Sequence, residues 1–418
     1  MIFGRKQYLQ ELIAGRENGL VKIVSGVRRC GKSFLLFRLW HDWLVSQGVS
    51  PDHLIEIQLD DYRNRDLRDP GHLLNYIDSR LTNDGSTYYV IIDEVQLLED
   101  FVEVILSLMH DSRVDVYVSG SNSHLLSSDV VTEFRGRGDE IRMWPLTFEE
   151  YHSAKCGDLR EDWKQYYTFG GLPQVATLET ETKKVSYLND LYETTYLCDV
   201  IERNGLRNEE GLRDLIRVLA SGMGCPTNPT RIANTFKTSA GVSMKRETIV
   251  KYIGFLRDAF LVEEALRYDV KGRRYIGTET KYYFTDVGLR GAILNFRQQE
   301  ETHIMENIIY NELRSRGYSV DVGLVEISGR DHEGTFVRTP LEVDFVVNQS
   351  PRRVYIQSAY RMPTEDKLRQ ERRPLLSIDD HFRKIIITGD DIHRKDDEQG
   401  ILTIGLFDFL TDKELIFS

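Results

Sequence analysis

One segment, residues 26–33, restricts the fold of this chain more than any other. It fits the pattern G-x-x-x-x-G-K-[ST] completely, and it lies between an apolar stretch of strand character at residues 21–25 and a Leu- and Phe-rich stretch of helical character. A glycine-rich turn between a strand and a helix presents backbone N–H groups and the positive helix end to phosphate oxygens. The motif therefore predicts an α/β fold in which a parallel sheet carries a nucleotide-binding loop.

Each position of this loop has an expected task. The glycines let the backbone close around phosphate oxygens. Lys32 is expected at the β- and γ-phosphates of ATP, and the Ser33 hydroxyl at Mg²⁺. The expected nucleotide-binding residues are Gly26, Val27, Arg28, Arg29, Cys30, Gly31, Lys32 and Ser33. A chance Gly-rich turn is the alternative, and the complete motif in its strand–helix context argues against it.

A pair of acids supports the same site. Residues 88–92 form an apolar stretch of strand character that runs directly into Asp93 and Glu94. Asp93 is expected to hold Mg²⁺, through water, beside Ser33. Glu94 is expected to orient and deprotonate the attacking water, which favours hydrolysis over simple binding. The alternative, two solvated acids at a strand end, fits poorly with a complete phosphate loop earlier in the same α/β region.

Two further groups are candidates for the site. The strand-like stretch 114–119 precedes polar residues, of which Asn122 or Ser121 is placed to hydrogen-bond the γ-phosphate or the attacking water. Arg137 or Arg135, in a glycine-flanked segment, is a candidate for the extra cation that a neighbouring subunit often supplies in phosphoryl transfer. The alternatives are a plain turn residue for Asn122 and ordinary surface arginines, and both interpretations stay open.

The middle of the chain has the pattern of a winged helix. The expected elements are helices at residues 211–222, 228–234 and 243–253, the last capped by Ser243, and hairpin strands at 262–268 and 281–286 around a basic turn at 271–274. In such modules the last helix enters a DNA groove. Residues 226–297 hold 13 Lys and Arg against 7 Asp and Glu. The candidate contacts to phosphates of double-stranded DNA are Lys245, Arg246, Lys251, Arg273 and Arg274. Because many winged helices bind protein instead, a protein partner stays open.

The C-terminal region has the outline of a restriction-type nuclease with two changed positions. Glu306 lies in an amphipathic helical pattern and Asp344 in a strand pattern. In such nucleases the next strand carries an acid-x-Lys pair that helps to bind Mg²⁺ and activate water, whereas here those positions hold Gln357 and Ala359. This change favours a structural or binding descendant over an active enzyme. The candidate substitutes on the next helical stretch, which keep an active nuclease open, are Glu365 and Lys367.

At 418 residues the chain is too long for one ordinary core, and its patterns divide it into four segments. In the first segment, apolar stretches alternate with helical ones, which predicts a parallel sheet with helices on both faces. These stretches are residues 54–59, 88–92, 114–119 and 141–146. We expect an α/β protein with a P-loop ATPase core (1–146), a helical lid (147–207), a winged-helix domain (208–300) and an inactive restriction-nuclease-like domain (301–418).

Charge, cysteines and hydropathy exclude several classes of protein. A net charge of −12 argues against a protein that simply coats nucleic acid. No apolar run approaches the ~20 residues that a membrane helix needs, and the first residues lack the apolar core of a secretion signal. The four cysteines lie far apart, without metal-ligand spacing. Together these features predict a cytoplasmic protein without a membrane association.

As a whole, the chain resembles the predicted prokaryotic ATPases of AAA type that join an N-terminal P-loop domain to an uncharacterised C-terminal region. The matching motifs are residues 26–33, 92–96, 119–122, 136–137, 144–151, 170–173, 284–289 and 342–345. The resemblance implies an ATPase core, a winged helix and a restriction-nuclease-like C-terminal fold. Its ATPase roles fall on Lys32, Ser33, Asp93 and Glu94. Nuclease catalysis does not carry over, because Gln357 and Ala359 depart from the nuclease pattern.

Three functions stay open at this point. The first is a Mg²⁺-dependent, ATP-hydrolysing switch or motor that acts on DNA or is regulated by it, with ATP sites completed across the interface of a homo-oligomer. The second is a nucleotide-controlled scaffold for a protein partner. The third is an ATP-gated, Mg²⁺-dependent nuclease. ATP and Mg²⁺ are the expected cofactors in each case.

Overall fold

The computed structural model describes residues 1–120, 134, 136–239, 244–330 and 336–417. The chain folds into two compact units. Unit 1 comprises residues 1–145 together with the short segments 172–177 and 258–260, and unit 2 comprises the remainder. Among the described helices, none combines the length and the apolar character that a membrane crossing requires.

Unit 1 is built around a five-stranded sheet with the order β2-β3-β4-β1-β5. Its strands are β1 (Val21–Gly26), β2 (Leu54–Gln58), β3 (Tyr88–Asp93), β4 (Val114–Ser119) and β5 (Gly138–Met143). All neighbouring strands are parallel. Four strands coincide with the expected stretches, and β5 lies three residues earlier than the expected 141–146. The predicted parallel sheet is therefore confirmed.

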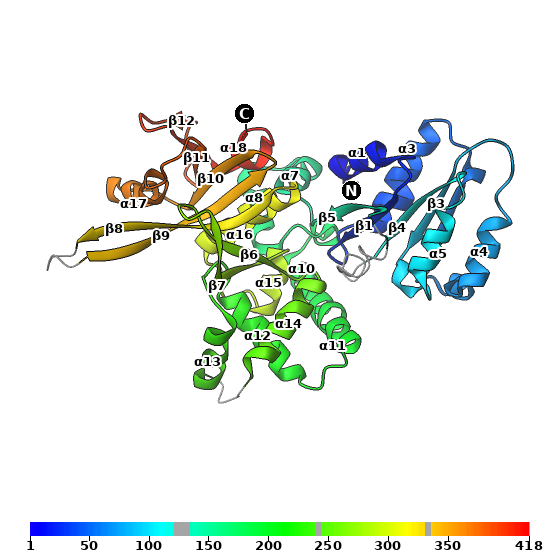
Figure 1. Ribbon diagram of the computed structural model, residues 1–418, viewed down its shortest axis with the longest axis horizontal. Helices are drawn as coiled ribbons and strands as arrows, with labels where there is room; N and C mark the ends of the chain where they lie inside the picture. Colours follow the sequence, from blue (N-terminus) through cyan, green and yellow to red (C-terminus); the bar gives the residue numbers. More distant parts are fainter. Residues whose placement is uncertain (121–133, 135, 240–243, 331–335, 418) are drawn as a thin grey trace. The chain divides into compact units, whose positions relative to one another are not determined.

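Helices cover both faces of this sheet (Figure 1). They are α1 (Lys6–Gly15), α2 (Lys32–Phe34) with its π-helical continuation (Leu35–Trp40) and α3 (His41–Ser46), α4 (Pro70–Asp78), α5 (Phe101–Leu108), and the short turns Pro51–His53, Tyr62–Arg68, Val95–Leu97 and α9 (Pro173–Thr177). On one face Leu73 of α4 and Ile105 of α5 pack in one apolar cluster with Val90. On the other face the ring of Trp40 lies 5.2 Å from the ring of Tyr117. Because successive strand residues point to opposite faces, buried strands such as β3 supply both layers.

Unit 2 begins with helices, as the pattern after residue 147 predicts. They are α7 (Phe148–Lys155), α8 (Leu159–Phe169), α10 (Glu181–Leu191) with its π-helical continuation (Tyr192–Leu197), and α11 (Cys198–Asn204). Helix α7 starts at a reciprocal cap. The Thr147 hydroxyl accepts the Glu150 N–H at 3.3 Å, and the Glu150 carboxylate accepts the Thr147 N–H at 3.1 Å. Such a cap satisfies N–H groups that the first turn leaves unpaired.

Three more helices and a hairpin follow in the expected order. They are α12 (Glu209–Ser221), α13 (Pro229–Ser239), α14 (Arg246–Asp258), β6 (Val262–Asp269) and β7 (Arg274–Phe284). Helix α14 begins three residues after the expected start, and the expected cap Ser243 lies outside the described residues. Strand β7 begins seven residues earlier than expected, because a tight turn in which the Asp269 carboxylate accepts the Gly272 N–H at 2.9 Å lets pairing start at once.

The hairpin belongs to a larger sheet. An eight-stranded sheet has the order β12-β13-β11-β10-β9-β8-β6-β7. Its further strands are β8 (Ser319–Arg330), β9 (Phe336–Gln349), β10 (Arg352–Ala359), β11 (Arg383–Thr388), β12 (Lys395–Asp396) and β13 (Ile401–Gly405), and its helices are α15 (Val287–Ile293), α16 (Glu301–Ser315), α17 (Glu365–Leu376) and α18 (Leu406–Thr411). Strand β6 pairs in parallel with β8. The sheet therefore runs across the expected boundary between residues 300 and 301.

Candidate nucleotide-binding site

The loop after β1 begins at a glycine that the fold requires. Gly26 has a φ of 133°, and a Cβ added there would lie 2.1 Å from the carbonyl oxygen of Met143 in β5. A second glycine, Gly31, has a φ of 101° and directly precedes α2. Positive φ values of this size are unstrained only for glycine. The two glycines of the motif thus let the backbone turn sharply between the sheet and the helix.

Lys32 is buried at this turn. Its ammonium donates to the carbonyl of Gly26 at 2.9 Å and to the carbonyl of Val27 at 3.1 Å. Between these carbonyls and the helix, the Cys30 side chain is fully buried, with its sulfur 3.8 Å from the Met143 carbonyl. The lysine is therefore held on the loop itself, next to the backbone groups that the motif assigns to phosphate binding.

Asp93 ends β3 beside the loop. The hydroxyl of Ser119, at the end of β4, donates to the Asp93 carboxylate. Ser33, the last residue of the motif, also hydrogen-bonds this carboxyl group. Burial raises the pKa of Asp93, while these two hydrogen bonds act in the opposite direction. Three elements separated in the sequence thus bring two hydroxyls to one carboxylate, at the edge of the sheet where the parallel strands end.

Ser119 is a site residue that the sequence analysis missed. Its neighbours Ser121 and Asn122 received the expected role, and both lie outside the described residues. The available signal was the position of Ser119 at the end of an apolar strand. Because β4 pairs with both β3 and β1, its last residue lies between the acid and the loop.

Glu94 follows Asp93 in an unusual backbone conformation. Its φ is 51°, in the left-handed region that non-glycine residues seldom adopt. The side chain is half-buried and accepts a hydrogen bond from the Gln96 amide. The backbone N–H of Glu94 donates to the Asp93 carboxylate at 3.1 Å. The turn thus directs Glu94 away from the course of β3 while keeping it next to Asp93.

Arg137 lies where the parallel strands begin, at the opposite end from the loop. Its carbonyl accepts the N–H of Val21 at 2.9 Å, at the first residue of β1, whereas the loop follows the last residue of that strand. Six strand residues span about 16 Å at 3.3 Å per residue. Arg137 is exposed, and the loop of its own unit follows the other end of β1. The second candidate, Arg135, lies outside the described residues.

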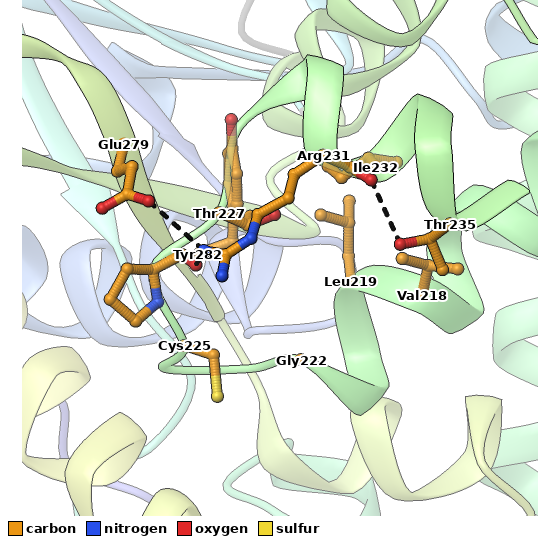
Figure 2. Close-up of a pocket in the computed structure, with 11 residues that line it drawn as sticks. Val218, Leu219, Gly222, Cys225, Thr227, Arg231, Ile232, Thr235, Glu279 and Tyr282 are labelled. Carbon is orange, nitrogen blue, oxygen red and sulfur yellow. Dashed lines mark hydrogen bonds and ion pairs between the residues drawn. The ribbon is translucent and has the colours of Figure 1, made fainter.

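The basic candidates in unit 2 are all exposed. They are Lys245, Arg246, Lys251, Arg273 and Arg274. Lys251 lies over the ring of Phe255 at 5.5 Å, and the Arg274 guanidinium lies 3.6 Å from the Asp269 carboxylate. Near them, α12, α13 and β7 enclose a pocket of about 640 Å³ (Figure 2). Arg231 and Glu279 form an ion pair across this pocket at 3.2 Å, so its charged groups are already matched.

The nuclease-like positions are arranged differently from expectation. Glu306 and Asp344 are both buried near one ammonium group, that of Lys281 on β7. The expected substitute Lys367 instead pairs with Glu371 of its own helix at 2.5 Å, and Glu365 is exposed in the first turn of α17. Lys281 is a second residue that the sequence analysis missed, and no local pattern marked it.

Parts of three motifs meet at one buried carboxylate of unit 2. Asp286 accepts the N–H of Gly171 at 2.8 Å and the N–H of Leu289 at 3.0 Å. The N–H of Leu146 in turn donates to the Gly171 carbonyl at 2.7 Å. Gly170 has a φ of 79°, and a Cβ there would lie 2.2 Å from Asp286. The parts of these motifs that lie in unit 2, residues 146–151, 170–171 and 284–289, are therefore linked at Asp286.

Residues 18–152 match the family described as an AAA domain, and residues 160–300 match a domain of unknown function. An uncharacterised protein of Haemophilus influenzae is 31% identical over 414 residues, which cover 98% of each chain. An uncharacterised protein of Methanocaldococcus jannaschii is 24% identical over 389 residues, covering 88% of this chain and 84% of that protein. The solved structure of a Walker-type ATPase of Pyrococcus abyssi has a TM-score of 0.51 and 15% identity, covering 70% of this chain and 96% of that one. That similarity extends the shared fold beyond the AAA match.

Proposed function

The chain belongs to the same family as the Haemophilus influenzae protein and carries an AAA domain, and from that premise we propose that it is a Mg²⁺-dependent ATPase that acts as a switch or motor. The observation that carries the proposal is the convergence of Ser33 and Ser119 on the Asp93 carboxylate beside the loop. A hydroxyl and a carboxylate on adjoining elements, next to a lysine, are the groups that a bound MgATP needs.

The loop residues have binding roles in this proposal. The ammonium of Lys32 exchanges its two backbone carbonyl partners for phosphate oxygens, and the N–H groups of the loop and of the start of α2 hold the remaining phosphate charge. Ser33, and Asp93 through water, would hold Mg²⁺, which would supply positive charge to the phosphates when bound. Oxygen ligands of this kind are those that Mg²⁺ prefers.

Glu94 has the proton-transfer role. Its carboxylate orients the attacking water and takes the proton as the water attacks the γ-phosphate. The Gln96 amide donates to one oxygen of the Glu94 carboxylate, and the left-handed backbone turn sets the direction in which the side chain leaves β3. Separate residues thus serve binding and water activation, which makes the two steps separable by mutation.

Lys32→Ala tests the binding step. Loss of an ammonium that contacts two phosphates is expected to weaken ATP binding by on the order of 10²-fold, because hydrogen bonds to charged groups contribute ~1.5–3 kcal/mol each. Titration of a fluorescent ATP analogue measures this loss. The exposed Lys6→Ala variant is the control and is expected to bind normally. Tight binding by folded Lys32→Ala contradicts the assigned site.

We further propose that α14 and the β6–β7 turn form a winged-helix surface for double-stranded DNA. The exposure of all five basic candidates supports this proposal. Binding of a DNA duplex is expected to weaken steeply with salt, with the log–log slope falling by roughly 1 for each phosphate contact removed. Replacing Lys245, Arg246, Arg273 and Arg274 together is expected to flatten the slope. An unchanged slope assigns this surface to a protein partner.

A further inference from the structure

Unit 2 contains a buried cluster of charges that the proposed ATPase does not use. The Lys281 ammonium lies 2.8 Å from the Glu306 carboxylate, 2.8 Å from the Glu342 carboxylate and 3.8 Å from the Asp344 carboxylate. The side chain of Lys281 is 4% exposed, and that of Glu306 is 8% exposed. Tyr283 donates its hydroxyl to Glu306 at 2.7 Å, and the Ser358 N–H donates to Asp344 at 2.8 Å. The cluster is thus closed off from water on most sides.

The oxygen atoms of this cluster come from three elements that the fold fixes in place. Glu306 projects from α16, while Glu342 and Asp344 are two residues apart on β9 and so share one face of the strand. In the antiparallel pairing of β9 and β10, Ile356 lies opposite Phe345. Gln357, the next residue of β10, therefore lies opposite Asp344, the preceding residue of β9. These oxygen-bearing side chains therefore lie on α16, β9 and β10, and Lys281 lies on another strand, β7.

The amide oxygen of Gln357 is an independent indication of a ligand site. Its residue is only 8% exposed, and its amide oxygen is buried without a hydrogen-bond partner. A buried amide oxygen without a partner is costly, because it has lost its hydrogen bonds to water. Together with the three carboxylates, an amide oxygen opposite Asp344 makes a set of hard oxygen donors, which is the ligand chemistry of Mg²⁺, Mn²⁺ and Ca²⁺.

We propose that this cluster has the oxygen ligands of a divalent-cation site and that the ammonium of Lys281 takes the place of the metal ion. The ammonium lies at hydrogen-bond distance, 2.8 Å, from Glu306 and Glu342 and at 3.8 Å from Asp344, whereas a metal ion draws its ligands to about 2.0–2.6 Å. Consistent with this, no group of three or more His, Cys, Asp and Glu side chains in the described part of the chain is arranged to hold a metal as it stands.

Whether the cluster holds an ammonium or a metal ion decides whether it can activate a water molecule. The occupant is the Lys281 ammonium, which lies 2.8 Å from each of two carboxylates and 3.8 Å from a third. An ammonium has no vacant coordination position and cannot lower the pKa of a bound water as a metal does. The site holds the β6–β7 hairpin against α16 and β9, and it does not hydrolyse phosphodiesters.

Lys281→Met in the full chain tests the proposal. Without the ammonium, the carboxylates are expected to recruit a divalent cation, so the variant should bind one Mn²⁺ per chain at least ten-fold more tightly than the wild type in the absence of nucleotide. Electron paramagnetic resonance of free Mn²⁺ measures this binding. Lys271→Met, on the same hairpin with its ammonium on the Glu326 carbonyl, is the matched control and should bind like the wild type. Lys281→Met/Asp344→Asn should lose the gain.

Two results overturn the proposal. One is a folded Lys281→Met that binds no more Mn²⁺ than the wild type, and the other is a wild type that already binds Mn²⁺ in a manner abolished by Asp344→Asn. If Lys281→Met unfolds in EDTA, folding restored by Mn²⁺ supports the proposal. Lys281→Met/Glu342→Gln, with one carboxylate fewer, repeats the test if needed, and failure of both variants to fold even in Mn²⁺ counts against it. Both the binding and the folding measurements omit ATP, so their outcome is distinguishable from that of the ATPase proposal.

Discussion

Each unit has a buried lysine and a buried acid at the site considered, but their partners differ. In unit 1 the Lys32 ammonium donates to loop carbonyls, and the Asp93 carboxylate accepts from two hydroxyls. In unit 2 the Lys281 ammonium lies directly against the carboxylates. A carboxylate held by neutral hydroxyls keeps its charge for a metal ion, whereas one held by an ammonium is already neutralised. We propose that the place of the lysine, rather than the presence of acids, distinguishes the proposed metal site of unit 1 from the buried cluster of unit 2.

The two units also differ in the origin of their cations. A mutation that tests this difference has the largest effect that we expect. Unit 2 supplies its own cation, whereas Arg137 lies about 16 Å of strand away from the loop of its own unit 1. We therefore expect the second cation at the γ-phosphate to come from another copy of the chain. Such a cation contributes ~10³-fold or more in rate, so Arg137→Ala is expected to reduce ATP turnover by about that factor.

Mixed assemblies provide the measurement. Arg137→Ala chains retain an intact loop, and Lys32→Ala chains retain Arg137, so mixing the two inactive proteins should partly restore ATPase activity. Arg113→Ala is the matched control, because Arg113 also precedes a strand at the same edge of the sheet and is paired with Asp111. Absence of restored activity in assemblies proven to be mixed, or a specific activity independent of concentration in a proven monomer, contradicts a cation supplied in trans.

The sequence was sufficient for the parallel sheet of unit 1 because its signals are local. The loop motif, the apolar strands and the acids after β3 are contiguous stretches, and in parallel strands the ends meet at one edge of the sheet. The role of Lys281 could not be found in this way, since its partners lie 25 and 61 residues further along the chain. Ser119 could be predicted only in part. Its strand was expected, but its contact with Asp93 depends on the order of the strands in the sheet. The winged-helix and nuclease-like interpretations of unit 2 stay predictions.

Asp286 is a third buried carboxylate, and its replacement is expected to have a smaller effect, on stability. Asp286 accepts backbone N–H groups, and burial outweighs those hydrogen bonds and raises its pKa to about 6 from 3.8. Because the folded-state pKa is raised, its contribution to stability is present below pH ~4 and is lost as the pH rises through ~6. Relative to Asp286→Asn, the wild type is expected to lose about 2–3 kcal/mol between pH 4 and pH 7.

Hydrogen exchange of the α15 amides in both proteins, compared at each pH, measures this difference in opening free energy. The comparison at equal pH removes the intrinsic pH dependence of exchange. A difference between the two proteins that stays constant from pH 4 to pH 7 contradicts the raised pKa. A decrease with pH identifies Asp286 as a carboxylate that neither a metal nor a lysine compensates, in contrast to Asp93 in the proposed ATPase site and Asp344.

The central claim is that unit 1 hydrolyses ATP with separate groups for binding and for water activation. Glu94→Gln keeps the size and hydrogen-bonding capacity of the side chain and removes the base. We expect this variant to bind MgATP about as tightly as the wild type and to hydrolyse it at least about 10²-fold more slowly, the usual contribution of general base catalysis. Single-turnover hydrolysis with binding measured on the same protein gives both quantities. Turnover at the wild-type rate contradicts the account.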